Sequence, residues 1–136
     1  MAYTVRDYMN KPIIVVDPET PVSSALSIMK RRGIHSLVVD LTEGAQVAYG
    51  IITTTDIRDK IAMAKRDPAA TMVGEIMTTP VHAANPRWTL QQCAEQMHTL
   101  GIHHMPVLDD DGLAVGMISA TDIFSAVEEA GWESLG

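Results

Sequence analysis

The sequence predicts an α+β or α/β fold in which two β-α-β-β-α repeats pack about a pseudo-twofold axis. A stretch of seven residues occurs twice, at 50–56 and at 116–122. Turns, helix ends and strand-like runs recur in the same order around both copies, which indicates an internal duplication. The longest apolar runs have the length of strands, and one repeat alone buries little of its sheet. The two repeats are therefore expected to cover each other.

The elements of the first repeat follow from its periodicity and its turn residues. They are expected to be, in order, a helical turn at 4–9, a strand at 13–16, a helix beginning at Pro21, a strand at 37–39, a strand at 46–53 and a helix at 54–64. Thr4 and Asp7 fit a capping box for the first turn. Thr20 is expected to cap the helix that begins at Pro21, and Gly33 to end it.

The repeated stretch consists of glycine, two apolar residues, a hydroxyl residue, a spacer, threonine and aspartate. Its copies are Gly50-Ile51-Ile52-Thr53-Thr54-Thr55-Asp56 and Gly116-Met117-Ile118-Ser119-Ala120-Thr121-Asp122. The apolar residues predict a strand and those after the aspartate a helix, so hydroxyls and carboxylate lie where a helix begins. Free N–H groups and the helix dipole at such a place suit an anionic ligand. The structural alternative is that each Thr/Ser-x-x-Asp is only a capping box.

The spacing of the repeats sets their boundaries. Gly33-Ile34-His35 and Gly101-Ile102-His103 lie 68 positions apart, as do Val5 and Val73, whereas the repeated stretch is 66 apart (116 − 50). The second repeat has thus lost two residues from the turn that precedes its copy. We assign residues 1–66 to the first repeat and 67–136 to the second, with a polar, proline-broken connection at 65–71.

Composition excludes several classes of protein. The chain has 136 residues, 46% of them apolar, and a formal charge of −7, which argues against binding to a nucleic-acid backbone. No apolar run is long enough to span a membrane, and the first residues do not resemble a signal segment. The single cysteine, Cys93, cannot form an intrachain disulfide. A cytoplasmic location is therefore expected.

These motifs resemble a tandem pair of cystathionine-β-synthase (CBS) domains, a Bateman module. The resemblance extends from about Val5 to Ala130 and is carried by the two copies of the repeated stretch, by Gly33-Ile34-His35 and by Gly101-Ile102-His103-His104-Met105-Pro106. The chain departs from the pattern at Val38, where the second repeat has Pro106. As a second departure, the module is expected to carry no attached enzyme or transporter that it could regulate.

The resemblance implies two related pockets in a cleft between the repeats, each drawing on both halves of the chain. In relatives that bind adenine nucleotides, the aspartate holds the ribose hydroxyls, as its two acceptor oxygens can do for a vicinal diol. One implied pocket contains Asp122, Ser119, Thr121, Pro12, Ile13, Ile14 and Ile34. The other contains Asp56, Thr53, Thr55, Pro80, Val81, His82 and Ile102. His35 and His103 are candidates for contact with phosphate, or are ordinary polar residues at a sheet edge.

Other chemistry has little support in the sequence. His82, His98, His103 and His104 match no structural zinc pattern, and the turn Asp109–Gly112 lacks the closing glutamate of a calcium loop. No base can be placed beside Cys93, so we expect no catalytic residue, no metal and no catalytic cofactor.

The resemblance therefore implies a regulatory module that binds AMP, ADP or ATP, with S-adenosylmethionine or NADH as alternatives. The competing hypothesis is a dimerising protein-interaction module with vestigial pockets, and an enzyme is the least supported class. A homodimer is expected through exposed apolar helix faces that include Ala62, Met63, Phe124 and Val127. A regulated protein partner is possible; nucleic acid and membrane are not expected as partners.

Overall fold

A computed structural model describes residues 2–136, and their backbone divides into two compact units. One unit, here called the Asp56 unit, is Ile14–Val81. The other, the Asp122 unit, combines the chain up to Ile13 with His82–Gly136. No helix among the described residues is long and apolar enough to cross a membrane.

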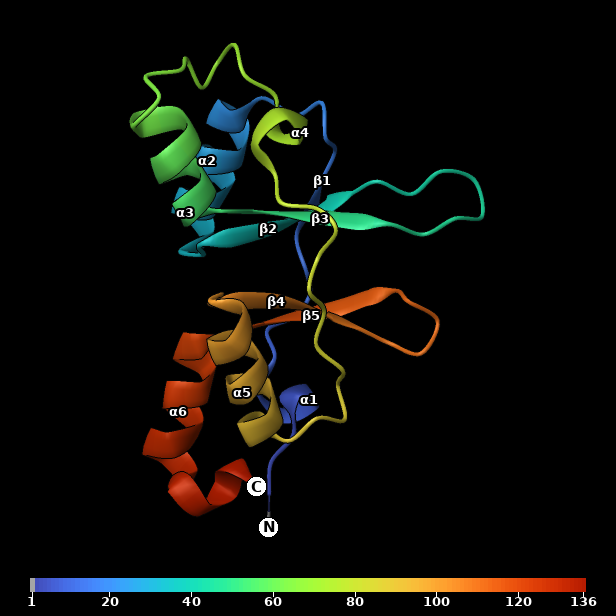
Figure 1. The fold of residues 1–136 in the computed structure, drawn as a ribbon, viewed down its shortest axis with the longest axis vertical. Coiled ribbons are helices and arrows are strands. Elements are labelled where there is room, and N and C mark those ends of the chain that lie inside the picture. The colour runs from blue at the N-terminus through green and yellow to red at the C-terminus, as the bar shows by residue number, and fades with distance from the viewer. Residues whose placement is uncertain (1) are drawn as a thin grey trace. The chain divides into compact units, whose positions relative to one another are not determined.

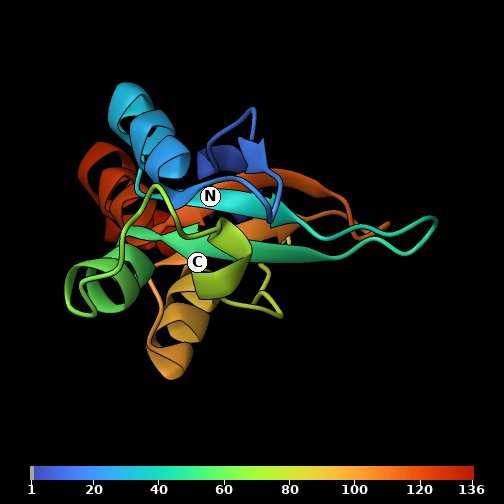
Figure 2. The same cartoon turned by 90° about the horizontal axis from the view of Figure 1, so that it is seen from above.

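The Asp56 unit is a three-stranded sheet with its helices packed on one face (Figure 1). Its elements are β1 (Val15–Val16), α2 (Val22–Arg32), β2 (Ser36–Asp40), β3 (Tyr49–Thr53), α3 (Thr54–Ile57), the π-helical turn η1 (Arg58–Ala62) and α4 (Val73–Ile76). The strands lie in the order β1-β2-β3, with β1 parallel and β3 antiparallel to β2. Helices α2 and α3 lie at the end of this sheet away from the β2–β3 loop (Figures 1 and 2).

The core of the Asp56 unit forms where α2 packs on the sheet. Its buried residues Val22, Ala25 and Met29 are three and four positions apart and so share one face of the helix. They pack against fully buried strand residues that include Leu37, Val39 and Ile52.

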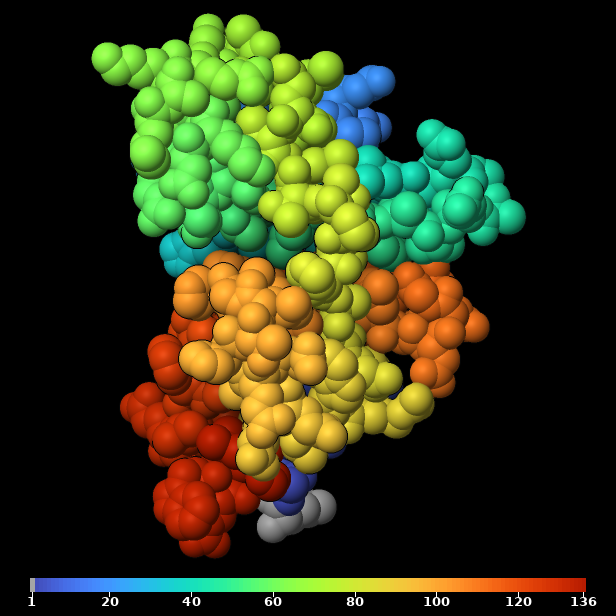
Figure 3. All heavy atoms as spheres, viewed as in Figure 1, coloured from blue at the N-terminus to red at the C-terminus, as the bar shows by residue number. Residues whose placement is uncertain are grey.

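The start of α2 corrects one expectation. Its N-cap residue is Pro21, without a side-chain cap, so the prediction of Thr20 as the cap was wrong. The free N–H groups of Val22 and Ser23 instead donate to the carbonyls of Thr71 (2.8 Å) and Pro68 (3.0 Å). The connecting segment 65–71, whose first part lies on the surface in Figure 3, thus supplies the cap. Gly33 ends α2 as expected, in a left-handed conformation with φ of 63°.

Three further elements of this unit are shorter than predicted. The strand expected at 46–53 begins only at Tyr49. The strand expected at 13–16 is hydrogen-bonded only at Val15–Val16. The helix expected at 54–64 is α-helical only over Thr54–Ile57 and continues as the π-helical turn η1. In this turn the Met63 N–H donates to the Arg58 carbonyl five residues earlier (2.9 Å).

The Asp122 unit repeats this plan with a smaller sheet. Its elements are α1 (Val5–Tyr8), α5 (Leu90–Leu100), β4 (His104–Leu108), β5 (Ala114–Ser119), α6 (Ala120–Ala130) and the 3₁₀ helix η2 (Trp132–Leu135). Strands β4 and β5 pair antiparallel, and the counterpart of β1 is a single parallel bridge from Ala84 to Val107. The core includes Val5, Leu90, Cys93, Met105 and Ile118, all buried.

Each unit contains a segment from the other sequence repeat. Helix α1, from the first repeat, packs in the Asp122 unit, where the Val5 N–H donates to the Trp88 carbonyl (2.9 Å). Helix α4, from the second repeat, packs in the Asp56 unit, where the Val73 N–H donates to the Thr20 carbonyl (2.8 Å). The compact units therefore do not follow the repeat boundary at 66/67, which stays a prediction about the sequence duplication.

Candidate functional site

Asp122 lies in the first turn of α6, directly after β5. Its Oδ2 accepts hydrogen bonds from the Ser119 N–H (2.7 Å) and from Ser119 Oγ (3.0 Å). The predicted capping box is present, so the carboxylate has a structural role at the start of the helix. Its other oxygen, Oδ1, takes no part in the box.

Asn10, from the first repeat, is the second partner of Asp122. Its Nδ2 donates to Oδ1 (3.0 Å) and to Oδ2 (2.9 Å). Two backbone hydrogen bonds to Met117, of 2.8 and 3.0 Å, hold Asn10 beside β5. The following residues, exposed Pro12 and half-buried Ile13, belong to the same unit as Asp122.

Asp56 has the same local surroundings in its own unit. Its Oδ2 accepts from the Thr53 N–H (3.0 Å) and from Thr53 Oγ1 (3.2 Å), and its own N–H donates to Thr53 Oγ1 (3.2 Å). Thr78 takes the place that Asn10 has in the Asp122 unit, since it bridges to Ile51 by two backbone hydrogen bonds. Its Oγ1 donates to Asp56 Oδ1 (3.2 Å).

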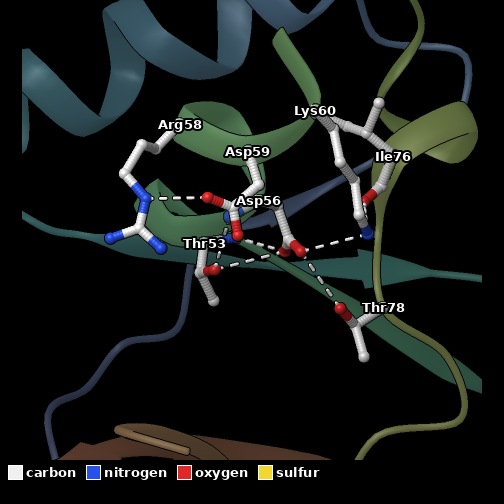
Figure 4. A network of polar contacts seen from close by, with 7 residues as sticks. All are labelled: Thr53, Asp56, Arg58, Asp59, Lys60, Ile76 and Thr78. Atoms are coloured by element: carbon white, nitrogen blue, oxygen red, sulfur yellow. Dashed lines mark hydrogen bonds and ion pairs between the residues drawn. The ribbon is translucent and has the colours of Figure 1, made fainter. Parts of the chain in front are cut away.

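Asp56 has one partner with no equivalent at Asp122. Lys60 Nζ lies 3.2 Å from Asp56 Oδ1 and 2.9 Å from the carbonyl oxygen of Ile76, which ends α4 (Figure 4). Asp56 is only 7% exposed, whereas Asp122 is half-buried. Among the described residues, no lysine or arginine forms an ion pair with Asp122.

The glycine that begins each repeated stretch is required by close packing. A Cβ added at Gly116 would lie 2.6 Å from Met9 Sδ and 3.1 Å from the Asn10 carbonyl oxygen. A Cβ added at Gly50 would lie 2.9 Å from Met77 Sδ and 3.3 Å from the carbonyl oxygen of Thr78. In both units, therefore, the strand must lack a side chain where the segment from the other repeat crosses it.

The two candidate histidines lie at equivalent backbone positions. The His35 carbonyl accepts from the Thr54 N–H, and the His103 carbonyl from the Ala120 N–H, both at 3.0 Å. Each histidine backbone thus lies beside the start of the helix in its own unit, and both residues are exposed. Their predicted contact with phosphate stays a prediction.

The predicted site residues divide between the units. With Asp122 lie Pro12, Ile13, His82, Ile102, His103, Ser119 and Thr121. With Asp56 lie Ile14, Ile34, His35, Thr53, Thr55, Pro80 and Val81. The predicted roles of Ile14 and Ile34 at Asp122, and of His82 and Ile102 at Asp56, join residues of different units and stay predictions.

Sequence reasoning missed Asn10, Thr78 and Lys60. The first two occupy equivalent places in the 68-residue repeat, each two positions before a proline. Lys60 lies four residues after Asp56, the spacing at which helical residues of opposite charge meet. Both signals were visible in the sequence, but neither one says which carboxylate oxygen is occupied.

Cys93, the single cysteine of the sequence, is buried. Burial and, to a smaller extent, the charge of Asp122 together raise the pKa of the Cys93 thiol to about 11. The thiol is therefore protonated at neutral pH and is a poor nucleophile. Within residues 2–136, no group of three or more His, Cys, Asp or Glu side chains is placed to hold a metal ion.

Comparison with known proteins identifies the family. The profile of the CBS domain matches residues 5–63 and again 73–129. The chain belongs to the CBS-domain family. It carries a CBS pair, a ligand-sensing module of a kind that is in general regulatory and binds adenosine-containing ligands.

Curated relatives carry the CBS pair in proteins of different length. The CBS domain-containing protein YhcV of Bacillus subtilis is 29% identical over 133 residues, which cover 98% of this chain and 90% of that protein. A homoserine O-acetyltransferase of Methanohalobium evestigatum is 30% identical over 125 residues, but the match covers 92% of this chain and only 24% of the enzyme. The chain thus spans about a quarter of that enzyme, and the likeness does not extend to the rest of it.

Solved structures share the fold. The CBS domain pair of the protein MJ0100, in complex with 5′-methylthioadenosine and S-adenosyl-L-methionine, has a TM-score of 0.81 and 27% identity, covering 94% of this chain and 98% of that one. A putative signal-transduction protein with CBS domains from Burkholderia ambifaria has a TM-score of 0.80 and 30% identity, covering 93% of each chain. A hexameric CBS-CP12 protein from bloom-forming cyanobacteria has a TM-score of 0.86 and 28% identity, covering 96% of this chain and 72% of that one.

Proposed function

We propose that this CBS pair is a regulatory sensor of an adenosine-containing ligand, with AMP, ADP or ATP as the first candidates, and that it is not an enzyme. The observation that carries the proposal is the arrangement at Asp122. A half-buried carboxylate at the start of a helix lies beside a backbone segment from the other repeat, and within residues 2–136 its Oδ1 accepts only from the neutral amide of Asn10. A ribose diol needs such an acceptor, and phosphate groups suit the start of a helix.

The ligand complex of the MJ0100 pair supports the chemical class of the proposed ligand. That protein binds 5′-methylthioadenosine and S-adenosyl-L-methionine, which share the adenosine group. Bound ligand would bias the protein between two states that a partner protein can distinguish. S-adenosylmethionine and NADH therefore stay in the set to be tested.

Calorimetric titration tests the proposal with AMP, ADP, ATP, S-adenosylmethionine and NADH on the wild-type chain and on Asp122→Asn. The substitution removes the charge that makes the carboxylate a strong acceptor, so affinity should fall tenfold or more, in line with the roughly 1.5–3 kcal/mol of a charged hydrogen bond. Asp111→Asn is the matched control, because it removes the same charge from an exposed turn of the same unit. Nucleotide affinity that is equal in all three proteins would contradict the ribose role of Asp122.

A role in assembly is favoured by exposed apolar side chains. Phe124 is 69% and Val127 40% exposed on α6 in the Asp122 unit, and Met63 is 72% exposed in the Asp56 unit. An apolar face of this kind is commonly covered by a second copy, so we propose a homodimer. Sedimentation at micromolar concentration should give the mass of a dimer, and Phe124→Ser should shift it toward the monomer.

A further inference from the structure

The two oxygens of Asp56 are both fully engaged within their own unit. Oδ2 accepts from the backbone and the hydroxyl of Thr53, and Oδ1 accepts from Lys60 and Thr78. A carboxylate offers about four lone-pair positions in all, so these four donors use its capacity. With 7% of its surface exposed, Asp56 has no free acceptor to offer to a diol.

The π-helical turn η1 of the Asp56 unit has no counterpart in α6 of the Asp122 unit. In α6 the buried residues Ile123 and Ala126 are three positions apart, whereas their counterparts Ile57 and Ile61 are four apart. The wider turn adds one residue between the buried positions. Position i+4 from the aspartate is therefore the half-exposed Lys60 in one unit and the fully buried Ala126 in the other.

Lys60 is held at two points, which makes it hard to displace. Its ammonium group contacts Asp56 Oδ1 (3.2 Å) and the Ile76 carbonyl oxygen (2.9 Å), and so joins η1 to the end of α4 (Figure 4). A ribose hydroxyl is a neutral donor, and a hydrogen bond from a charged donor is roughly twice as strong as one from a neutral donor. A diol at Asp56 would have to replace both this charged contact and the hydroxyl of Thr78.

A diol at Asp122 would have to replace fewer and weaker contacts than a diol at Asp56. Among the residues that the structure describes, its Oδ1 accepts from one group, the amide of Asn10, which is exposed and uncharged. Rotation of that one side chain leaves Oδ1 open, while Ser119 keeps Oδ2 in place. The capping box then remains intact when a ligand binds.

We infer that Lys60 closes the Asp56 site to diols, so that each chain takes one adenosine-containing ligand, at Asp122. This inference rests on the proposed function, whose ligand class it uses. Asp56 then has a structural role, because its contacts hold α3, η1 and the segment 76–78 together. Of the two duplicated aspartates, Asp122 binds ligand and Asp56 stabilises the fold.

The experiment is a calorimetric titration with the tightest-binding nucleotide of the panel, read as stoichiometry as well as affinity. The wild-type chain should bind one ligand, Asp56→Asn should leave stoichiometry and affinity unchanged, and Lys60→Met should add a second site. Lys30→Met is the matched control, since it removes a lysine charge from an exposed position of α2 in the same unit and should still give one site. Circular dichroism of each variant checks that it is folded.

The outcomes separate the inference from the proposed function. No binding of any nucleotide to the wild-type chain would overturn the proposed function, and the inference with it. Two ligands per wild-type chain, or loss of binding in Asp56→Asn, would overturn the inference alone. Weaker binding in Lys60→Met would also overturn it, because Lys60 would then contact the ligand instead of blocking Asp56.

Discussion

The Asp56 unit and the Asp122 unit share a capping box, an antiparallel bridge to the segment from the other repeat, and a glycine where that segment crosses the strand. They differ in Lys60, a charged partner of Asp56 in addition to Thr78, whereas Oδ1 of Asp122 accepts from the neutral Asn10. The three shared features are the same in both copies because backbone hydrogen bonds and close backbone contacts restrict the residue types at these positions. The side chains that contact Oδ1 differ between the units, and they determine which hydrogen bonds this oxygen can still accept.

The largest difference between the units should appear in stability when each aspartate is changed to asparagine. At Asp56, either orientation of the new amide turns its NH₂ group toward a group that can only donate, the Thr53 N–H or the Lys60 ammonium. At Asp122, the amide of Asn10 can rotate and present its own oxygen. We expect Asp56→Asn to cost about 3 kcal/mol and Asp122→Asn about 1 kcal/mol of unfolding free energy.

Urea unfolding followed by circular dichroism measures both losses. The double variant Asp56→Asn with Lys60→Met is the control, since removing the ammonium group leaves the amide a tolerated orientation and should restore part of the stability. Equal losses in the two single variants would show that Lys60 does not distinguish the sites.

The two close-packed glycines allow a finer comparison. The Cβ of Gly116→Ala meets Met9 at 2.6 Å and the Asn10 backbone oxygen at 3.1 Å, whereas that of Gly50→Ala meets Met77 at 2.9 Å and the Thr78 oxygen at 3.3 Å. Overpacking of this kind costs about 1–3 kcal/mol, so we expect about 2 kcal/mol at Gly116 and about 1 kcal/mol at Gly50. Thermal unfolding of the two variants measures which substitution destabilises the protein more.

Shortening the opposing methionine provides the check. Met9→Ala should reduce the penalty of Gly116→Ala, because it removes the nearest contact, and Met77→Ala should do the same for Gly50→Ala. A penalty that does not change in the double variants would place the strain elsewhere.

The smallest expected difference lies at the caps of α1 and α4. Glu75 Oε2 accepts from the Met72 N–H and Oε1 from Arg66, both at 2.7 Å, and these contacts, the backbone one foremost, hold the pKa of Glu75 below its ordinary value. Because the folded-state pKa is the lower one, the stabilisation is present above the unfolded-state pKa and is lost as pH falls through the folded-state pKa. The Asp122 unit has Asp7 in this position, capping the Thr4 N–H at 2.8 Å.

Unfolding measured at about pH 7 and about pH 3 tests this point. Glu75→Gln should be slightly less stable than the wild-type chain at the higher pH and indistinguishable from it at the lower pH. Arg66→Gln should raise the pKa of Glu75 in an NMR titration. The same stability difference at both pH values would mean that the charge of Glu75 contributes nothing.

The sequence by itself determined the duplication, the order of elements and the local caps. The capping boxes at Thr53–Asp56 and Ser119–Asp122 and the end of α2 at Gly33 involve residues at most a few positions apart, so short-range hydrogen bonding and backbone sterics are enough to predict them. The repeat spacing and the motifs also led to the CBS pair, which the comparisons confirmed.

The tertiary structure decided which residues complete each site. Asn10 reaches Asp122 across 112 positions of the chain, Thr78 reaches Asp56 across 22, and the carbonyls of Pro68 and Thr71 cap α2 in place of Thr20. Lys60 was within reach in the sequence, but its contact with the Ile76 carbonyl depends on where α4 packs and on the widened turn η1. These contacts depend on packing between distant segments, whose partners no local sequence pattern encodes, and they give two nearly identical motifs different hydrogen-bond partners.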